Sequence, residues 1–256
     1  MRAHFRARSL LDLIRKAFPI LAAFLFASLV AGAHAQTEAP PPTALEKQLN
    51  KVDLSVAGIG IFNNTVSGPV IPQNAPNYCL YDGDTPTNCG SNNITQFGSN
   101  TLGALVSIHY PAKPYFGLEF NYSYARYTEN YTGPAVTSFL PVGLSTFQVQ
   151  TKVNEYTFGY LITPPYTIFG LQPFASVGAG PMGFKPTPGG GQSLPEKARM
   201  TYYYSLGFSK DLSPHIGVRA GFRELFFLDP DFGQNYLTIL KHATTYEPMA
   251  GFYLRF

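Results

Sequence analysis

Six charged residues stand among apolar neighbours in the parts of this chain whose polarity alternates. Glu119, for example, lies between Leu118 and Phe120, and Arg223 follows Phe222. The full set is Glu119, Glu155, Arg219, Arg223, Glu247 and Arg255. Carboxylates and guanidinium groups gathered on one enclosed face would either pair into salt bridges or line a charged constriction for ions. The element that holds them decides between these two chemistries.

The chain contains two cysteines, Cys79 and Cys89. An even pair in an oxidising compartment favours a disulfide. Such a bridge would close a loop of about ten residues and contribute on the order of 2–3 kcal/mol against the unfolded chain. No metal-ligating residues accompany the pair in the pattern of a metal or redox site, so we interpret it as a loop staple.

Two other groupings resemble ligand sites but lack the spacing that those sites need. The Asp-Gly-Asp run at 82–84, and Asp229 with Asp231, offer oxygen ligands for Ca²⁺ without the EF-hand pattern. Three glycines at 189–191 are not followed by Gly-Lys-Ser/Thr, so they do not form a phosphate loop. We expect solvated turns and a flexible loop tip here, with no metal and no cofactor.

The composition is unusual for a soluble domain. Of 256 residues, 45% are hydrophobic and only 13% are charged, about half the usual charged share. There are 17 Tyr, 21 Phe and no Trp, with 24 Gly and 22 Pro. Abundant Tyr and Phe suit a surface that lies partly in lipid; a Tyr-rich secreted β-sandwich is the alternative.

The net charge of +3 arises at the N-terminus. Residues 1–35 hold five of the 18 basic residues and one of the 15 acidic ones, so the remainder is close to neutral. Nucleic-acid binding, which would need a basic patch in the mature domain, is therefore not supported.

Residues 1–35 are predicted to be a signal peptide. A basic segment precedes an apolar stretch at 17–30, and Ala-His-Ala at 33–35 has the form of a cleavage site. A membrane anchor is the alternative, but the apolar stretch is shorter than the ~20 residues of a spanning helix. Residues 36–51, which include three consecutive prolines, are predicted to be a periplasmic lead, and residues 52–256 a single domain.

Eight segments of alternating polarity follow this lead. Successive strand side chains point to opposite faces, and a barrel in lipid turns its apolar face outward. Two places break the alternation. Ile59 and Ile61 have the opposite parity to the start of their segment, which suggests a bulge at Gly58, and 147–153 has shifted parity and is expected to extend above the membrane. The segments are 52–62, 102–110, 116–125, 147–162, 169–178, 200–208, 216–223 and 246–256.

The connections between these segments alternate in length. Short turns are predicted at 111–114, 163–166 and 211–214, and long loops at 63–100, 129–145, 185–197 and 229–242. A barrel with an even number of strands that starts in the periplasm places short turns on that side and long loops outside. A lipocalin-type barrel would have an apolar interior and no reason for this rhythm. The pattern therefore predicts an eight-stranded antiparallel up-and-down transmembrane β-barrel.

The last strand carries Phe252, Leu254 and the terminal Phe256 on one face. It resembles the aromatic-ended terminal strand of bacterial outer-membrane β-barrels, which implies recognition by the barrel-insertion machinery. The stretch 171–180 (LQPFASVGAG) is similar to a strand of the OmpA-like transmembrane domain family. The resemblance implies a monomer in the bacterial outer membrane, in contact with lipid and lipopolysaccharide. The peptidoglycan-binding domain of many relatives is not expected.

Inside such a barrel, the six charges are expected to form a plug. A lipid-facing Arg or Lys would cost ~2–4 kcal/mol near the midplane, and eight strands enclose only enough space for side chains. An outer-membrane lipid-modifying enzyme would need His, Ser and a carboxylate at the lipid-facing rim. His109 and Ser107 point inward by parity, and no acid is placed beside them by sequence, so the chain is predicted not to be an enzyme.

The favoured function is therefore a structural or surface-interaction role carried by long extracellular loops. A narrow passive pore for ions or small solutes is the alternative, because of the inward charges. A lipid-modifying enzyme is the less favoured alternative. The sequence identifies no extracellular ligand.

Overall fold

The computed structural model describes residues 52–69, 80–82, 85–87, 93–133, 146–234 and 237–255. Cys79, Cys89, residues 83–84 and Phe256 lie outside these ranges. Within them, no helix has the length and apolar character needed to cross a bilayer.

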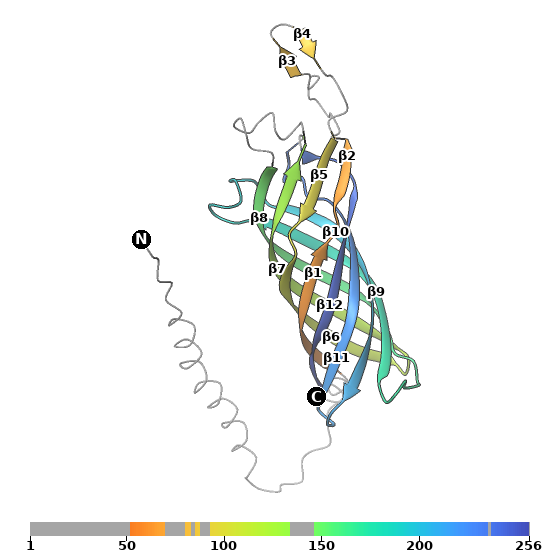
Figure 1. The fold of residues 1–256 in the computed structure, drawn as a ribbon. Helices are drawn as coiled ribbons and strands as arrows, with labels where there is room; N and C mark the ends of the chain where they lie inside the picture. Colours follow the sequence, from red (N-terminus) through yellow and green to blue (C-terminus); the bar gives the residue numbers. More distant parts are fainter. Residues whose placement is uncertain are drawn as a thin grey trace, which may run out of the picture. The chain divides into compact units, whose positions relative to one another are not determined.

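Eight antiparallel strands form a closed barrel (Figure 1). Each strand pairs with the next around the ring, and the last pairs back with the first. In ring order they are β1 (Asp53–Asn63), β6 (Thr101–Lys113), β7 (Phe116–Thr132), β8 (Thr146–Ile162), β9 (Gln172–Pro186), β10 (Lys197–Asp211), β11 (Ile216–Leu228) and β12 (His242–Arg255). The predicted eight-stranded up-and-down barrel is confirmed.

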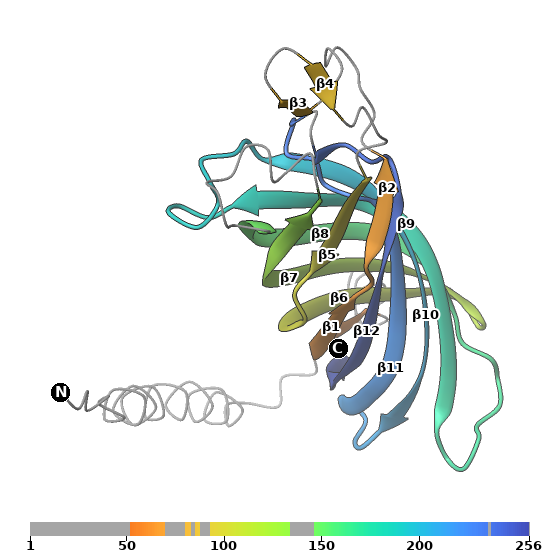
Figure 2. The ribbon, with the colours of Figure 1, turned by 45° about the horizontal axis from the view of Figure 1, so that its top comes forward.

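Four shorter strands belong to the first long connection. β5 (Asn93–Gly98) pairs with the end of β7, and β2 (Val66–Pro69) pairs with β5. These two strands therefore lengthen the barrel wall beyond the end of β1 (Figure 2). β3 (Leu80–Asp82) and β4 (Thr85–Thr87) form a separate two-stranded hairpin.

The two ends of the barrel differ in their connections. The short connections, residues 114–115, 163–171 and 212–215, lie at one end, together with the start of β1 and the end of β12. We call this the turn end. The long connections, which include 187–196 and 229–241, belong to the opposite end, the loop end. The alternation of short and long connections agrees with the prediction.

The turn between β8 and β9 is longer than predicted. Ile168 and Leu171 form an isolated bridge, and Phe169 and Gly170 between them have φ angles of 52° and 75°. Positive φ at both central residues is the geometry of a tight hairpin turn. The prediction that Phe169 starts the fifth strand was therefore wrong, because this residue occupies the tip of the turn, where it is 99% exposed.

The outer face of the barrel is apolar. Phe120, Phe158 and Phe252 are 41%, 53% and 64% exposed, whereas Glu119, next to Phe120, is 5% exposed. A soluble barrel would reverse this arrangement, because exposed apolar surface of this extent is unfavourable in water. The inverted polarity is that of a barrel whose outer wall lies in lipid.

An apolar layer, which encloses the buried polar side chains of Gln96, Glu129 and Asp229, fills the loop-end half of the interior and explains both breaks in the sequence pattern. β1 keeps an unbroken register with β6 and β12, so the bulge suggested at Gly58 was wrong. Ile59 and Ile61 point inward, as do Val149 and Val153 of β8, which is also paired regularly with β7. Their parity differs from the rest because they fill a dry interior. The apolar layer also contains Tyr127, Tyr131, Met182, Phe184, Leu225, Phe227, Phe232, Leu237 and Ile239.

Candidate functional site

A buried ion-pair triad crosses the middle of the barrel. Arg223 of β11 donates through Nη2 to Glu155 Oε1 at 2.6 Å and through Nη1 to Glu247 Oε2 at 2.7 Å. The Arg223 and Glu155 side chains are 1% and 0% exposed. Glu247 is the cross-strand neighbour of Arg223, while Glu155 reaches it from β8. One cation thus holds two carboxylates together away from water.

Tyr203 of β10 supports this triad from one side. The Arg223 guanidinium lies 4.9 Å from the centre of the Tyr203 ring. Room for the ring comes from two glycines, because a Cβ at Gly159 or Gly178 would lie 2.6 Å or 2.7 Å from Tyr203 atoms. The Tyr203 hydroxyl donates to Glu119 Oε1 at 2.8 Å, which links the triad to a second polar group.

That second group is centred on Glu119. Its carboxylate accepts hydrogen bonds from Asn121 Nδ2 at 2.6 Å and Ser176 Oγ at 3.0 Å, and lies 2.9 Å from His109 Nε2. An ionised carboxylate only accepts, so Nε2 of His109 carries the proton and Nδ1 is an acceptor. Arg219 Nη1 lies 2.8 Å from both Nδ1 and Nε2 of this ring, and of the two only Nδ1 can then accept its proton. Glu119, His109 and Arg219 therefore form a chain of hydrogen bonds across the lumen.

Between these groups the interior is almost filled. The space enclosed among Glu119, Arg223 and Met249 amounts to about 10 Å³, roughly the room for a single water molecule. The charged layer thus leaves little room for water between its side chains.

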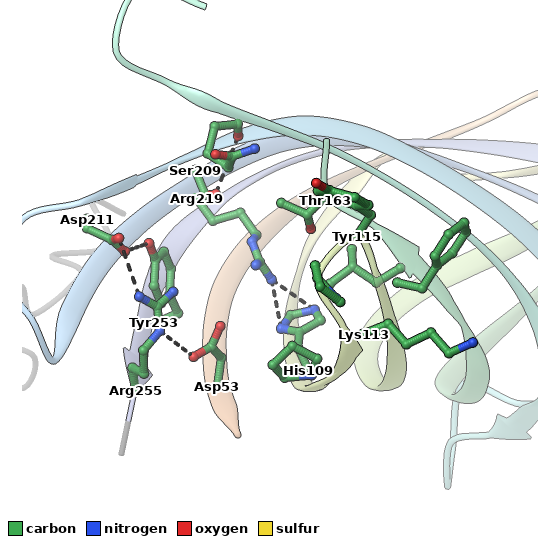
Figure 3. Close-up of a pocket in the computed structure, with 16 residues that line it drawn as sticks. Asp53, His109, Lys113, Tyr115, Thr163, Ser209, Asp211, Arg219, Tyr253 and Arg255 are labelled. Atoms are coloured by element: carbon green, nitrogen blue, oxygen red, sulfur yellow. Dashed lines mark hydrogen bonds and ion pairs between the residues drawn. The ribbon is translucent and has the colours of Figure 1, made fainter. Parts of the chain in front are cut away.

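Below the charged layer, a pocket of about 320 Å³ opens at the turn end (Figure 3). Arg255 stands at its mouth, with Nε 3.0 Å from Asp53 Oδ1 and Nη1 3.3 Å from Asp211 Oδ2. The Tyr253 hydroxyl also donates to Asp211. Arg219 projects into the same pocket from β11, and Lys113 lines it at the β6–β7 turn.

No family model matches this chain, and no curated protein sequence matches it either. Among solved structures, the outer membrane protein OprG of Pseudomonas aeruginosa is similar over 80% of this chain and 95% of its own, with a TM-score of 0.51 and 12% identity. Neisserial surface protein A is similar over 80% and 97%, with a TM-score of 0.45 and 9% identity. The chain has the outer-membrane β-barrel fold. Together with its apolar outer face, this fold belongs in the bacterial outer membrane.

The six sequence-predicted charges of this outer-membrane barrel divide between two places. Five lie in the charged layer: Glu119, Glu155, Arg219, Arg223 and Glu247. Arg255 lies instead at the turn-end mouth, where its side chain is 41% exposed, because it is the last residue of β12. Its partners are aspartates at strand ends, which the inward-parity argument did not include.

Sequence reasoning missed the partner of His109. It placed no acid beside this residue, yet Glu119 lies directly opposite it in the β6–β7 pairing. Ser107 Oγ donates to Asn121, not to His109. His109 and Ser107 are both buried inside the barrel and away from the lipid-facing rim.

The connection at 229–241 forms a cap at the loop end. Phe232, Leu237 and Ile239 are buried in the apolar layer. Asp231 holds the connection to β10, with Oδ1 3.2 Å from Lys197 Nζ and Oδ2 2.9 Å from Arg199 Nη2. The connection therefore packs into the mouth of the barrel and is tied to its wall.

The interpretation of Asp229 and Asp231 as solvated turn residues was wrong, because both are buried. Burial raises the pKa of Asp229 to about 7, although the charge of Arg199 opposes this. Burial also acts to raise the pKa of Asp231, but the Gly233 N–H and the charges of Arg199 and Lys197 outweigh it and lower that pKa. Folding therefore shifts the pKa of Asp229 upward and the pKa of Asp231 downward.

Proposed function

We infer that this protein is a non-enzymatic outer-membrane barrel that is closed to ions and acts through its loop end. The single observation that carries this proposal is the filled interior, in which the Arg223 triad and the apolar layer lie one above the other. Breaking a buried ion pair is costly. The Arg223 triad therefore fits a permanent plug that closes the lumen better than it fits a charged constriction through which ions pass.

The loop end supports a structural or surface-interaction role. The wall continues into β2 and β5, and the 229–241 connection packs into the mouth. An ordered platform of this kind suits loops that make contacts outside the cell, since loops on a rigid scaffold commonly carry binding.

The finer assignments are part of the same proposal. Membership of the OmpA-like transmembrane domain family rests on the 171–180 stretch and the aromatic terminal strand. We place the protein as a monomer among outer-membrane lipid and lipopolysaccharide, inserted by the barrel-insertion machinery through Phe252, Leu254 and Phe256.

Planar-bilayer recording on refolded protein tests the proposal. The wild-type barrel is expected to give no steady single-channel steps. Steps that change in conductance when Arg223 is replaced by Gln would establish the narrow passive pore instead. Mass spectra of lipid A with and without the protein are expected to be identical, and a modified species would establish the lipid-modifying enzyme.

A further inference from the structure

We propose that the turn-end pocket binds a small oxyanion, with inorganic phosphate as the simplest case, through the guanidinium of Arg219. The pocket is separate from the loop end and does not depend on the proposed surface role. Its volume of about 320 Å³ is ample for one hydrated tetrahedral oxyanion.

Arg219 is the cation in this pocket that is set up for a ligand. Its guanidinium lies 4.8 Å from the centre of the Phe174 ring and 5.3 Å from that of Tyr253. The two aromatic rings fix its direction. Guanidinium groups fixed in this way lose little entropy when they bind an oxyanion.

Arg219 also lacks an anionic partner. Among the described residues, no carboxylate lies within 4.0 Å of it, although every other arginine in the charged layer and at the mouth has one. Its Nη1 contacts the ring nitrogens of His109, and its Nε is buried with no hydrogen-bond partner. A partly buried cation in this state is costly, and a bound oxyanion would offset that cost.

The other charges around the pocket leave Arg219 available. Arg255 pairs with both Asp53 and Asp211, the two acids that line the pocket. Lys113, Arg219 and Arg255 together outnumber these two acids, so the lining keeps a net positive charge. Glu119, the acid behind His109, is occupied by its donors Asn121, Ser176 and Tyr203. Lys113, at the mouth, adds a second cation without a carboxylate partner among the described residues.

The position of the pocket also limits where the ligand comes from. Residues of the short turns, including Pro114, Tyr115 and Thr163, line its opening, and the charged layer closes its inner end. The ligand therefore enters from the turn end and does not pass through the barrel. A free oxyanion and the phosphate headgroup of a lipid at that membrane surface share the required chemistry.

Isothermal titration of refolded protein in a maltoside detergent, which carries no phosphate of its own, tests the proposal. Inorganic phosphate is expected to bind with a stoichiometry of one. Arg219→Gln, which retains a hydrogen-bond donor toward His109, is expected to weaken binding about tenfold or more, because it removes one charge-assisted contact. Lys113→Ala, at the exposed mouth, is expected to weaken binding less. Lys185→Ala, which removes an exposed lysine at the loop end, is the matched control and is expected to bind like wild type.

Heat-modifiable gel migration confirms that each variant is folded before titration. If Arg219→Gln does not fold, the affinity of Lys113→Ala relative to Lys185→Ala decides. A second series with short-chain phosphatidylglycerol and phosphatidylcholine distinguishes a lipid headgroup from a free ion. Absence of saturable phosphate and phospholipid binding by wild type overturns the proposal, and so does equal binding by the Arg219 and Lys185 variants.

Discussion

His109 lies directly across the β6–β7 hairpin from Glu119, and its Nε2 is 2.9 Å from a Glu119 carboxylate oxygen. This pairing ties the first hairpin of the barrel to the polar groups of the opposite wall, because Glu119 also accepts a hydrogen bond from Tyr203 of β10. The charged layer is therefore held by contacts across the lumen as well as by the strand ladder.

Removing the cation of the buried triad is expected to destabilise the barrel strongly. In Arg223→Met, Glu155 and Glu247 are left buried without a counter-charge, and we expect a loss of about 3–5 kcal/mol. Urea unfolding in lipid vesicles, followed by circular dichroism, measures it. The control is Lys185→Met. In the wild type, Lys185 Nζ lies 3.7 Å from Glu196 Oε2 in an exposed pair, which is expected to contribute less than about 1 kcal/mol. Equal losses in the two variants would refute the assignment of a structural triad.

A charge placed on the outer face is expected to be costly. Phe158→Arg puts a guanidinium on the lipid-facing side of β8 and is expected to destabilise the barrel by about 2–4 kcal/mol in bilayers. Phe158→Leu is the control and is expected to remain close to wild type. The same urea titration reports both values, and an Arg variant as stable as the Leu variant would show that this face does not lie in hydrocarbon.

The loop-end cap is expected to weaken with rising pH through Asp229. Its pKa is raised from 3.8 in the unfolded chain to about 7 in the folded protein. Ionisation is therefore disfavoured by folding, and stability falls as the pH rises from about 4 to about 7. Asp229→Asn is expected to raise the urea midpoint at pH 8 and to leave it nearly unchanged at pH 4.

Asp231 provides the matched comparison with the opposite sign. Its pKa is lowered by folding, so its contribution is present above pH 3.8, its ordinary pKa, and is lost as the pH falls through the lower folded value. Asp231→Asn is expected to lower the midpoint at pH 8, because Lys197 and Arg199 lose their partner. If both Asn variants shift the midpoint in the same direction at pH 8, the assignment of the two carboxylates is wrong.

Phe256 is expected to act in assembly more than in stability. Deletion of Phe256 is predicted to reduce the amount of barrel in outer-membrane fractions several-fold, while protein refolded in detergent keeps a similar urea midpoint. Quantitative immunoblotting of membrane fractions measures the first effect. An unchanged amount in the membrane would remove this residue from the predicted recognition signal.

The sequence was most informative where the barrel meets lipid. Apolar parity in segments such as 116–125 predicted which side chains face outward, because the hydrocarbon selects one kind of side chain over a whole face. The same parity placed Glu119 and Arg223 inside. One face of each strand meets lipid and the other meets the lumen. This difference selects different side chains for the two faces, so apolar and polar residues alternate along the sequence.

The side chains of the interior were predicted less well, because a barrel interior can be filled either by paired polar and charged side chains or by packed apolar ones. Ile59 and Val149 broke the expected pattern because they pack inside the loop-end half of the barrel. From the sequence, apolar residues had been assigned to the outer face only. The His109–Glu119 pair was accessible in principle, because a tight turn centred near residue 114 sets these two residues opposite each other. The rings of Phe174 and Tyr253 around Arg219 come from separate strands, and no local pattern indicated that they would meet there.

The Arg223 triad also bears on the order of assembly. Glu247 is a neighbour of Arg223 on the adjacent strand, but Glu155 lies on β8, which is not next to β11 in the sheet, and it meets Arg223 across the lumen. In a sheet that has not closed, Glu155 would lack the guanidinium that balances its charge in the finished barrel. The charges of the triad therefore balance only in the closed ring, so opening the barrel would expose Glu155 and Arg223 without each other.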